Sequence, residues 1–251
     1  MRTAIVVEFR KAAASRTLWV TSVLVAFGIP LLAGALSAAA RAGNEQILAQ
    51  LGPLGGASHW ELLTGITSQV SAAGALLAFG VGLSWLFGRE FADNTVTGVF
   101  AQPITRGSIA LAKLCVFLLW AAATACALVA ATSAAGFALD FPLGEGAFAD
   151  QVRLFALLVS TAALATPAAW AATLGRGLLP GIAITILILI TAQVVAIAAP
   201  QAAAWMPLAA PALWALFPGS VHPGQLALVL VVPVIFSAAT ALAWQRLQLD
   251  R

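Results

Sequence analysis

The sequence contains few charged side chains: 12 lysines and arginines and 9 aspartates and glutamates among 251 residues. Charged residues make up 8% of the chain, whereas a soluble domain contains about 25%. Hydrophobic residues make up 62%, and the mean hydropathy is +1.00. So few charges cannot cover a globule of this size, which excludes a soluble enzyme, a nucleic-acid-binding domain and a disordered chain.

Cysteine and histidine are also scarce, with two residues of each. The eleven helical residues that separate Cys115 and Cys126 span about 16 Å, which is too far for a disulfide. His59 and His222 are isolated from each other and from the cysteines. No spacing typical of a metal site is present, so we expect no metal ligands.

Lysine occurs at only two positions, in Arg10-Lys11-Ala12 and Ala112-Lys113-Leu114. A P-loop requires lysine between glycine and serine or threonine, and neither lysine has these neighbours. We therefore expect no cofactor and no catalytic residue in this chain. If the protein performs ATP-driven work, a partner subunit must bind ATP and magnesium.

The remaining sequence has long uncharged tracts, at 17–40, 62–88, 114–139, 154–175 and 177–245. A helix needs about 20 apolar residues to cross the roughly 30 Å hydrocarbon core. The first four tracts match one helix each, and five prolines between Pro200 and Pro223 divide the fifth. The first is longer than the apolar core of a signal peptide, so we expect it to remain as a span.

The sequence thus predicts an all-α polytopic membrane protein with one domain over 1–251. Its six spans are expected at about 17–40, 64–87, 109–138, 152–174, 181–199 and 224–245. Pro30, Pro167 and Pro233 fall within spans and predict kinks.

Basic residues are distributed unevenly between the connecting segments. With both termini inside, the outer segments contain only Arg41 and Arg153. The inner segments contain the other ten: Arg2, Arg10, Lys11, Arg16, Arg89, Arg106, Lys113, Arg176, Arg246 and Arg251. Because cytoplasmic loops carry the excess of lysine and arginine, we expect a protein of the cytoplasmic (inner) membrane with both termini in the cytoplasm, and no nucleic-acid partner.

The spans contain only mildly polar groups. No ionisable residue occurs at mid-membrane, although carriers driven by ion gradients usually hold one there. Gln69 and Gln193 are expensive to bury in lipid, so we expect them to face another helix or a cavity as polar groups of a pathway. Gly74, Ala78 and Gly82 recur at helical spacing, which allows close packing either within the chain or between subunits.

The inner segment 88–113 is the most informative part of the chain. It is predicted to form a short helix in which Phe91, Thr95, Val99 and Phe100 share an apolar side with no bilayer above it. Pro103 ends that helix, and Thr105 or Ser108 can cap the next. Such a helix suits docking to another protein; the alternative is an ordinary inner loop.

The same segment contains Glu90-Phe91, Asn94-Thr95, Pro103-Ile104-Thr105-Arg106 and Lys113, in this order. The order and spacing of these residues resemble those of the type-2 ABC-transporter permeases. The run from Gln102 to Trp120 is most similar to the bacitracin-resistance and lantibiotic-immunity branch. Asn94 replaces the usual glycine but tolerates a positive φ, and Gly98 replaces a larger aliphatic residue.

The resemblance implies a role for each segment. Residues 90–102 would be the coupling helix that sits on an ABC ATPase subunit, with Arg89, Glu90, Phe91, Asn94, Thr95, Val99, Phe100, Pro103 and Arg106 as coupling residues. Residues 2–16 would be the interfacial elbow helix, with Ile5, Phe9, Arg10 and Lys11; by its own pattern it is amphipathic with a basic face for anionic lipid. Residues 200–223 would hold short re-entrant helices, or else form a plain outer loop.

The resulting hypothesis is the transmembrane subunit of an ABC exporter. Its expected partners are an ABC ATPase subunit, a second copy of itself or a related permease, and membrane lipids. An uncharged pathway favours an amphipathic or lipid-like cargo, such as a peptide antibiotic, a drug or a lipid-linked molecule. The main alternative is a membrane scaffold or regulatory subunit that docks a soluble partner and transports nothing; a carrier that acts alone is a third.

Overall fold

The computed structural model describes residues 2–51, 54, 56–101, 103–141, 146–217 and 219–248. These residues form helices and the turns between them, with no strand among them. Six helical segments are long and apolar enough to cross a membrane, which confirms the predicted number and order of spans: Arg16–Arg41, His59–Ala92, Arg106–Ala138, Ala147–Leu174, Leu178–Ala198 and Pro223–Arg246.

Three spans are single helices and three are interrupted. The single ones are α5 (His59–Ala92), α7 (Arg106–Ala138) and α10 (Leu178–Ala198). The first span consists of α2 (Arg16–Val23), a π-helical turn (Leu24–Gly28) and α3 (Ile29–Arg41), and the fourth of α8 (Ala147–Leu164) and α9 (Pro167–Leu174). The sixth consists of α13 (Pro223–Ala227), a 3-10 turn (Leu228–Leu230) and α14 (Val231–Arg246). Shorter helices are α1 (Arg2–Ala13), α4 (Glu45–Leu51), α6 (Val96–Phe100), α11 (Pro200–Ala203) and α12 (Ala210–Leu216).

Each interruption lies just before a proline within a span. A proline cannot donate to the carbonyl four residues earlier and its ring clashes with that carbonyl. The π-helical turn precedes Pro30, the break between α8 and α9 precedes Pro167, and the 3-10 turn precedes Pro233. The carbonyl of Ala163, which Pro167 leaves without its helical donor, accepts a bond from the Thr166 hydroxyl at 2.7 Å.

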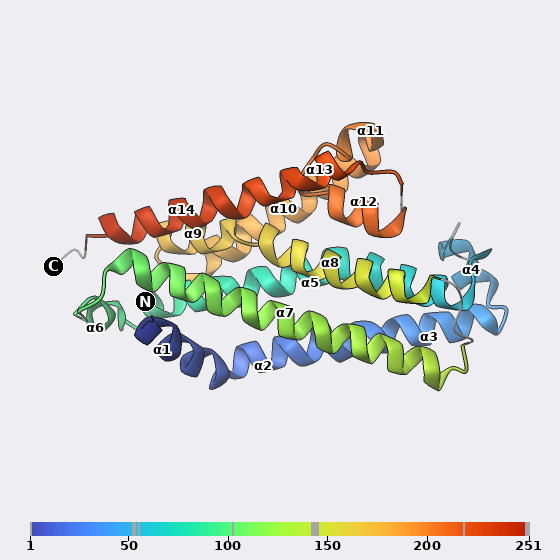
Figure 1. Cartoon of the computed structure of the whole chain (residues 1–251), viewed down its shortest axis with the longest axis horizontal. Helices are drawn as coiled ribbons and strands as arrows, with labels where there is room; N and C mark the ends of the chain where they lie inside the picture. The colour runs from blue at the N-terminus through green and yellow to red at the C-terminus, as the bar shows by residue number, and fades with distance from the viewer. Residues whose placement is uncertain are drawn as a thin grey trace.

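The two longest helices extend beyond a bilayer. α5 has 34 residues and α7 has 33, so each is about 50 Å long, against a hydrocarbon core of about 30 Å. Their projecting turns meet α1, α6 and the end of α14 at one end of the bundle (Figure 1). We call this end the N/C end, because the first and last described helices both reach it.

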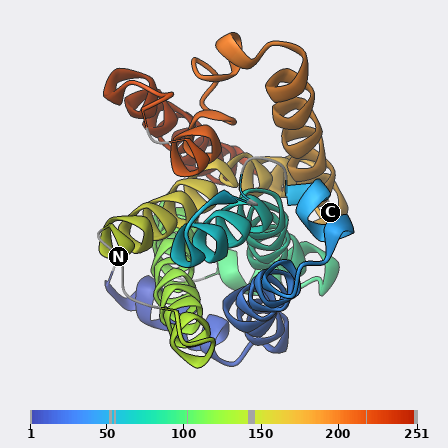
Figure 2. The same ribbon diagram turned by 90° about the vertical axis from the view of Figure 1, so that its right-hand side faces the viewer.

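The core of the bundle is built around α5. This helix packs against α3, α7, α8, α9 and α10, and its Phe79 contacts the rings of Phe117 and Trp120 on α7. The fifth and sixth spans are peripheral: only 17% and 11% of their most apolar stretches are buried. In Figure 2 the orange α10 and the red α13 diverge from each other and from the other spans at the end of the bundle that faces the viewer.

The segment 200–223 contains two short helices, α11 and α12. α12 packs against α5 and α8, at the end of the bundle away from α1 and α6, and Ala210 and Pro211 are buried. Pro218 lies outside the described residues. A re-entrant arrangement in a bilayer remains a prediction.

The small-residue stripe of α5 accommodates bulky neighbours of the same chain. A methyl group at Gly82 would lie 2.9 Å from the Trp120 ring and 3.3 Å from Leu18. At Gly74 the nearest atom would be Ile29 Cδ1 at 3.8 Å, which is an ordinary contact. Gly82 therefore serves packing of α5 against α2 and α7, and Gly74 is exposed on the described chain.

We expect Gly82→Ala to lower the free energy of unfolding by about 1–3 kcal/mol, the usual cost of overpacking. Trp120 cannot move aside freely, because its Nε1 donates to Ser22 at 2.8 Å. The matched control is Gly74→Ala, which gains helix propensity of about 0.5–1 kcal/mol without a clash. Thermal unfolding in detergent compares the two; equal midpoints would contradict this packing.

Candidate functional site

Four charged side chains from three helices form a closed ring of ion pairs at the N/C end. Lys113 Nζ of α7 donates to Glu8 Oε2 of α1 at 2.7 Å and to Glu90 Oε1 of α5 at 2.8 Å. Lys11 Nζ of α1 donates to the same two carboxylates, at 2.9 Å to Glu8 and 3.0 Å to Glu90. We call Glu8, Lys11, Glu90 and Lys113 the ion cluster. It joins α1, the end of α5 and the start of α7.

The ion cluster is buried and neutral overall. The Lys113 side chain is 1% exposed and both carboxylates are 3% exposed, whereas Lys11 is 30% exposed. Charges can be buried only if they are paired, because each loses its hydration. Glu90 Oε2 is buried without a hydrogen-bond partner among the described residues, so Glu90 depends on its other oxygen, which both lysines share.

The electrostatics of α1 follow from this pairing. Burial alone would raise the pKa of Glu8, but Lys113 and Lys11 outweigh it and hold that pKa below its ordinary value. Burial alone would lower the pKa of Lys11, but Glu8 and Glu90 raise it above its ordinary value. Both groups are therefore held in their charged forms.

The turn after α5 depends on Asn94. The backbone N–H of Thr95 donates to the carbonyl of Glu90 at 3.0 Å, and that of Asn94 to the carbonyl of Phe91 at 3.2 Å. These two bonds form a Schellman motif, which requires a left-handed residue after the helix. Asn94 has φ 53°, so the predicted tolerance of asparagine at this position is confirmed.

The segment after this turn differs from the single predicted helix. Glu90 and Phe91 belong to α5, and only the five residues of α6 form a separate helix. α6 ends before Pro103, as predicted, and Thr105 occupies the N-cap position of α7. The Thr105 hydroxyl bonds to that of Ser108 at 2.7 Å. Gln102 lies outside the described residues.

The prediction that this segment has a free apolar side is wrong, because its three large apolar residues, Phe91, Val99 and Phe100, pack within the chain. Val99 is buried, and the rings of Phe91 and Phe100 lie 6.5 and 5.6 Å from that of Trp244 on α14. Trp244 is fully buried, and its Nε1 donates to Thr173 Oγ1 of α9 at 3.0 Å. The apolar side thus anchors the segment to the sixth span.

The two predicted arginines stack on aromatic rings. The guanidinium of Arg106 lies 4.2 Å from the Phe100 ring centre, and its Nη1 donates to the carbonyl of Leu247 at 2.6 Å. Arg89 lies 4.4 Å from the ring centre of Trp85. Arg106 therefore connects the start of α7 both to α6 and to the end of α14.

The outward surface of the segment is polar and made of small side chains. Between α5 and α7 the exposed residues are Asp93, Asn94, Thr95, Thr97, Gly98, Ala101, Pro103 and Thr105. A methyl group at Gly98 would have no neighbour within 4 Å. A partner that approaches the N/C end would meet this surface rather than the phenylalanines.

α1 exposes Phe9 and Arg10 of its predicted interfacial residues, and only Lys11 has a different environment from the one expected. Its buried face is formed by Ala4, Glu8 and Ala12, and Ile5 packs against the core. Phe9 is 55% exposed, and Arg10 is also exposed. Lys11 was expected on a basic face towards lipid; instead it joins the ion cluster, because two buried carboxylates lie within its reach. The interfacial position of α1 remains a prediction.

Gln69 and Gln193 do not face another helix of this chain. Both are exposed, on α5 and α10. Their expected place as polar groups of a pathway, against another helix or a cavity, stays a prediction.

The ion cluster as a unit is not predicted from the sequence. Glu8 is not among the expected site residues, and the expectations for Lys113 do not include an ion pair. A signal was available: few acids belong to the basic inner segments, namely Glu8, Glu90, Asp93 and Asp250. An acidic side chain that is buried beside an uncharged tract needs a basic partner, because it loses its hydration. The two lysines of the chain are candidates for this partner.

The fold and this site define a multi-pass membrane protein with a short, firmly held segment between its second and third spans. Residues 4–193 match the ABC-2 family transporter protein family. The chain belongs to this family and is a transmembrane subunit of an ABC transporter. Membership implies pairing with an ABC ATPase subunit. No match was found among curated proteins. The matched region includes the whole ion cluster and ends before α14.

We expect Lys113→Met to lower the free energy of unfolding by about 3–5 kcal/mol, because it leaves two buried carboxylates with one lysine. The double variant Lys113→Met with Glu90→Gln restores a neutral cluster and should lose less than the sum of the single variants. Arg153→Gln breaks the partly buried i,i+3 pair with Asp150 within α8 and should cost less, about 1 kcal/mol. Denaturation of all four in detergent tests this; additive losses would contradict the coupling.

The docking of α1 should depend on pH at both extremes. The folded pKa of Glu8 is lowered from 4.5, so its stabilisation is complete above that value and is lost as the pH falls through the folded pKa. The folded pKa of Lys11 is raised from 10.5, so its stabilisation is complete below that value and is lost as the pH rises through the folded pKa. Fluorescence transfer between labels on α1 and α7 should form a plateau between these limits. In Glu8→Gln the acid limb should disappear; its persistence would refute the assignment.

Proposed function

We propose that this chain is the membrane subunit of an ABC exporter in the cytoplasmic membrane, with the N/C end in the cytoplasm. The orientation rests on the basic residues, ten of which belong to segments on the side of the termini and two to the other side. The chain itself hydrolyses no ATP in this proposal; the partner subunit binds ATP and magnesium.

The observation that carries the proposal is the way segment 93–105 is held. At one end of the segment, Glu90 is tied to Lys113 and Lys11. At the other end, Arg106 contacts Phe100 and the backbone of Leu247. A force that a partner exerts on the segment is therefore transmitted to the second, third and sixth spans together. A loop that only connects two helices needs no such attachments.

The ATPase subunit docks on the exposed small residues of this segment. Asp93, Thr97, Gly98 and Ala101 point away from the bundle, so they can enter a cleft without disturbing the packing of Phe100. Those predicted coupling residues that pack within the chain do not touch the ATPase; they transmit its movement to the spans. Nucleotide-driven closure pushes on the segment and tilts α5 and α7.

A second permease subunit, identical or related, covers the exposed amides of the spans. Gln69 and Gln193 are exposed on α5 and α10, and an amide without a hydrogen-bond partner is costly in hydrocarbon. A dimer that encloses these glutamines provides a mildly polar pathway. Such a pathway suits an amphipathic or lipid-like cargo. The resemblance of the run Gln102–Trp120 to the bacitracin-resistance and lantibiotic-immunity branch favours a peptide antibiotic as that cargo, and hence a role in antibiotic resistance.

The alternative of a scaffold that transports nothing shares the docking segment and differs in its response to cargo. Proteoliposomes with the permease and its ATPase separate the two. An exporter shows ATP hydrolysis that rises with cargo and cargo that accumulates in the lumen of inverted vesicles. A scaffold shows assembly without either response.

We expect Gly98→Trp to abolish assembly with the ATPase and the stimulation of ATP hydrolysis, because the indole fills the docking surface. The fold should tolerate it, since an added side chain meets nothing at Gly98 and surface changes usually alter stability by less than about 0.5 kcal/mol. The matched control is Gly56→Trp, at an equally open position away from the N/C end. If Gly98→Trp still co-purifies with the ATPase subunit and still stimulates its ATP hydrolysis, the assigned docking surface is wrong.

A further inference from the structure

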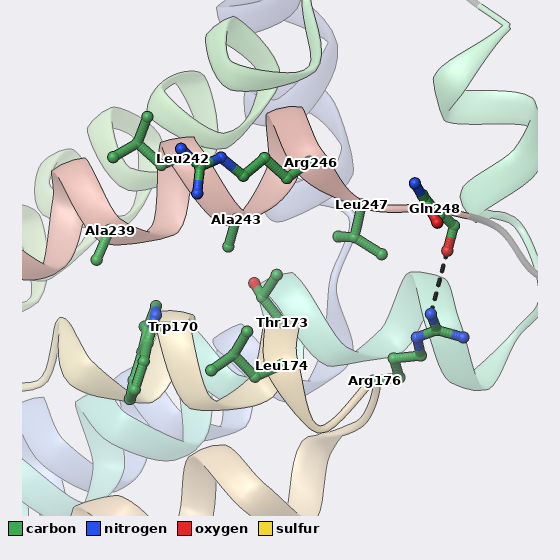
Figure 3. Close-up of a pocket in the computed structure, with 10 residues that line it drawn as sticks. All are labelled: Trp170, Thr173, Leu174, Arg176, Ala239, Leu242, Ala243, Arg246, Leu247 and Gln248. Atoms are coloured by element: carbon green, nitrogen blue, oxygen red, sulfur yellow. Dashed lines mark hydrogen bonds between the residues drawn. The ribbon is translucent and has the colours of Figure 1, made fainter.

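A groove of about 500 Å³ opens between α9 and α14 at the N/C end. One wall is formed by Trp170, Thr173 and Leu174 of α9, and the other by Ala239, Leu242 and Ala243 of α14 (Figure 3). The small Ala239 and Ala243 leave the space between the helices open. The groove plays no part in the proposed docking of the ATPase.

The end of the groove nearest the chain terminus is basic. Arg246 lies at the end of α14 and Arg176 at the turn between α9 and α10, where its φ is 49°. Among the residues that the structure describes, none that lines the groove is acidic. Arg176 Nη2 donates to the carbonyl of Gln248 at 3.1 Å, and the Arg246 side chain extends back along α14 towards Leu242 (Figure 3). The positive charges therefore border an apolar slot.

The order of these groups along the helices matches the order of layers in a membrane leaflet. Arg246 occupies the last turn of the sixth span and Arg176 the turn just after the fourth, which is the level of the headgroups. Trp170 lies deeper, and its ring centre is 5.7 Å from that of Phe236. Arginine at the cytoplasmic boundary is attracted to anionic lipid. An amphiphile with one negative headgroup and an aliphatic chain is complementary to both parts of the groove.

We infer that this groove binds one anionic phospholipid of the cytoplasmic leaflet. The phosphate contacts Arg246, Arg176 adds positive potential beside it, and the first part of an acyl chain lies between Trp170 and Ala239. The statement that the lipid comes from the cytoplasmic leaflet rests on the proposed orientation. The binding itself does not, because it depends only on the shape and charge of the groove.

The groove is connected to the docking segment through the side chains of Thr173 and Trp244. Thr173 lines the groove and accepts the bond from Trp244 Nε1 at 3.0 Å, and the ring of Trp244 contacts that of Phe100. Lipid between α9 and α14 therefore holds the anchor of α6 in place.

The experiment measures lipid binding to the purified, delipidated full chain in detergent by native mass spectrometry. Phosphatidylglycerol and phosphatidylcholine with identical chains are the probes. We expect one tightly bound phosphatidylglycerol and weaker phosphatidylcholine. Arg246→Gln should weaken phosphatidylglycerol binding by about fivefold, the effect of one basic residue near an anionic surface. Arg176→Gln should act in the same direction.

Two further variants separate the groove from general attraction to charge. Ala239→Phe fills the slot without a change in charge and should reduce binding of phosphatidylglycerol. Arg41→Gln removes an equal charge from the exposed end of α3, away from the N/C end, and should leave the tight site intact. A thermal midpoint close to that of the unmodified chain shows that each variant is folded.

Three results would overturn the inference. They are equal affinity for phosphatidylcholine and phosphatidylglycerol, an equal loss in Arg41→Gln and Arg246→Gln, and displacement of the lipid by glycerol phosphate at the same concentration. The last would indicate a site for a free phosphate anion. None of these readouts involves the ATPase, so they are independent of the proposed export function.

Discussion

The structure at the N/C end depends on the mutual pairing of four charged side chains at one largely buried site. Each member of the ion cluster loses most of its hydration, and only the other members compensate for this loss. Because Glu8, Glu90 and Lys113 come from three different helices, the compensation is possible only when α1, α5 and α7 are placed together. The electrostatic requirement therefore fixes the position of α1 and the geometry of the segment between α5 and α7.

A second constraint comes from Trp244, which closes the same region from the other side. Its ring is surrounded by Phe87, Phe91 and Phe100, and its N–H is bonded to Thr173. Lys113 also lies 5.8 Å from this ring. The ion cluster and the aromatic side chains around Trp244 therefore lie next to each other. The sixth span, which lies beyond the family match, completes the attachment of the docking segment.

Much of the fold was accessible from the sequence, because the signals are local or additive. The length of each apolar tract predicted the six spans, and the prolines predicted the positions of their interruptions. The preference of asparagine for a positive φ predicted the turn at Asn94. The partners of Phe100, Glu8 and Lys11 were not accessible. Their contacts join residues far apart in the sequence, such as Glu8 with Lys113, which are 105 positions apart, and Phe100 with Trp244. Hydropathy carries no information about which helices become neighbours.

The sequence by itself determined that this is a six-span membrane protein with no P-loop and an informative segment between its second and third spans. Composition alone suffices for this, because lipid accepts long apolar helices in any order. Only the tertiary structure decided which way the side chains of that segment face. An apolar side without bilayer above it can be covered either by a partner or by the chain itself, and here α14 covers it. What remains for a partner is the small, polar surface around Gly98.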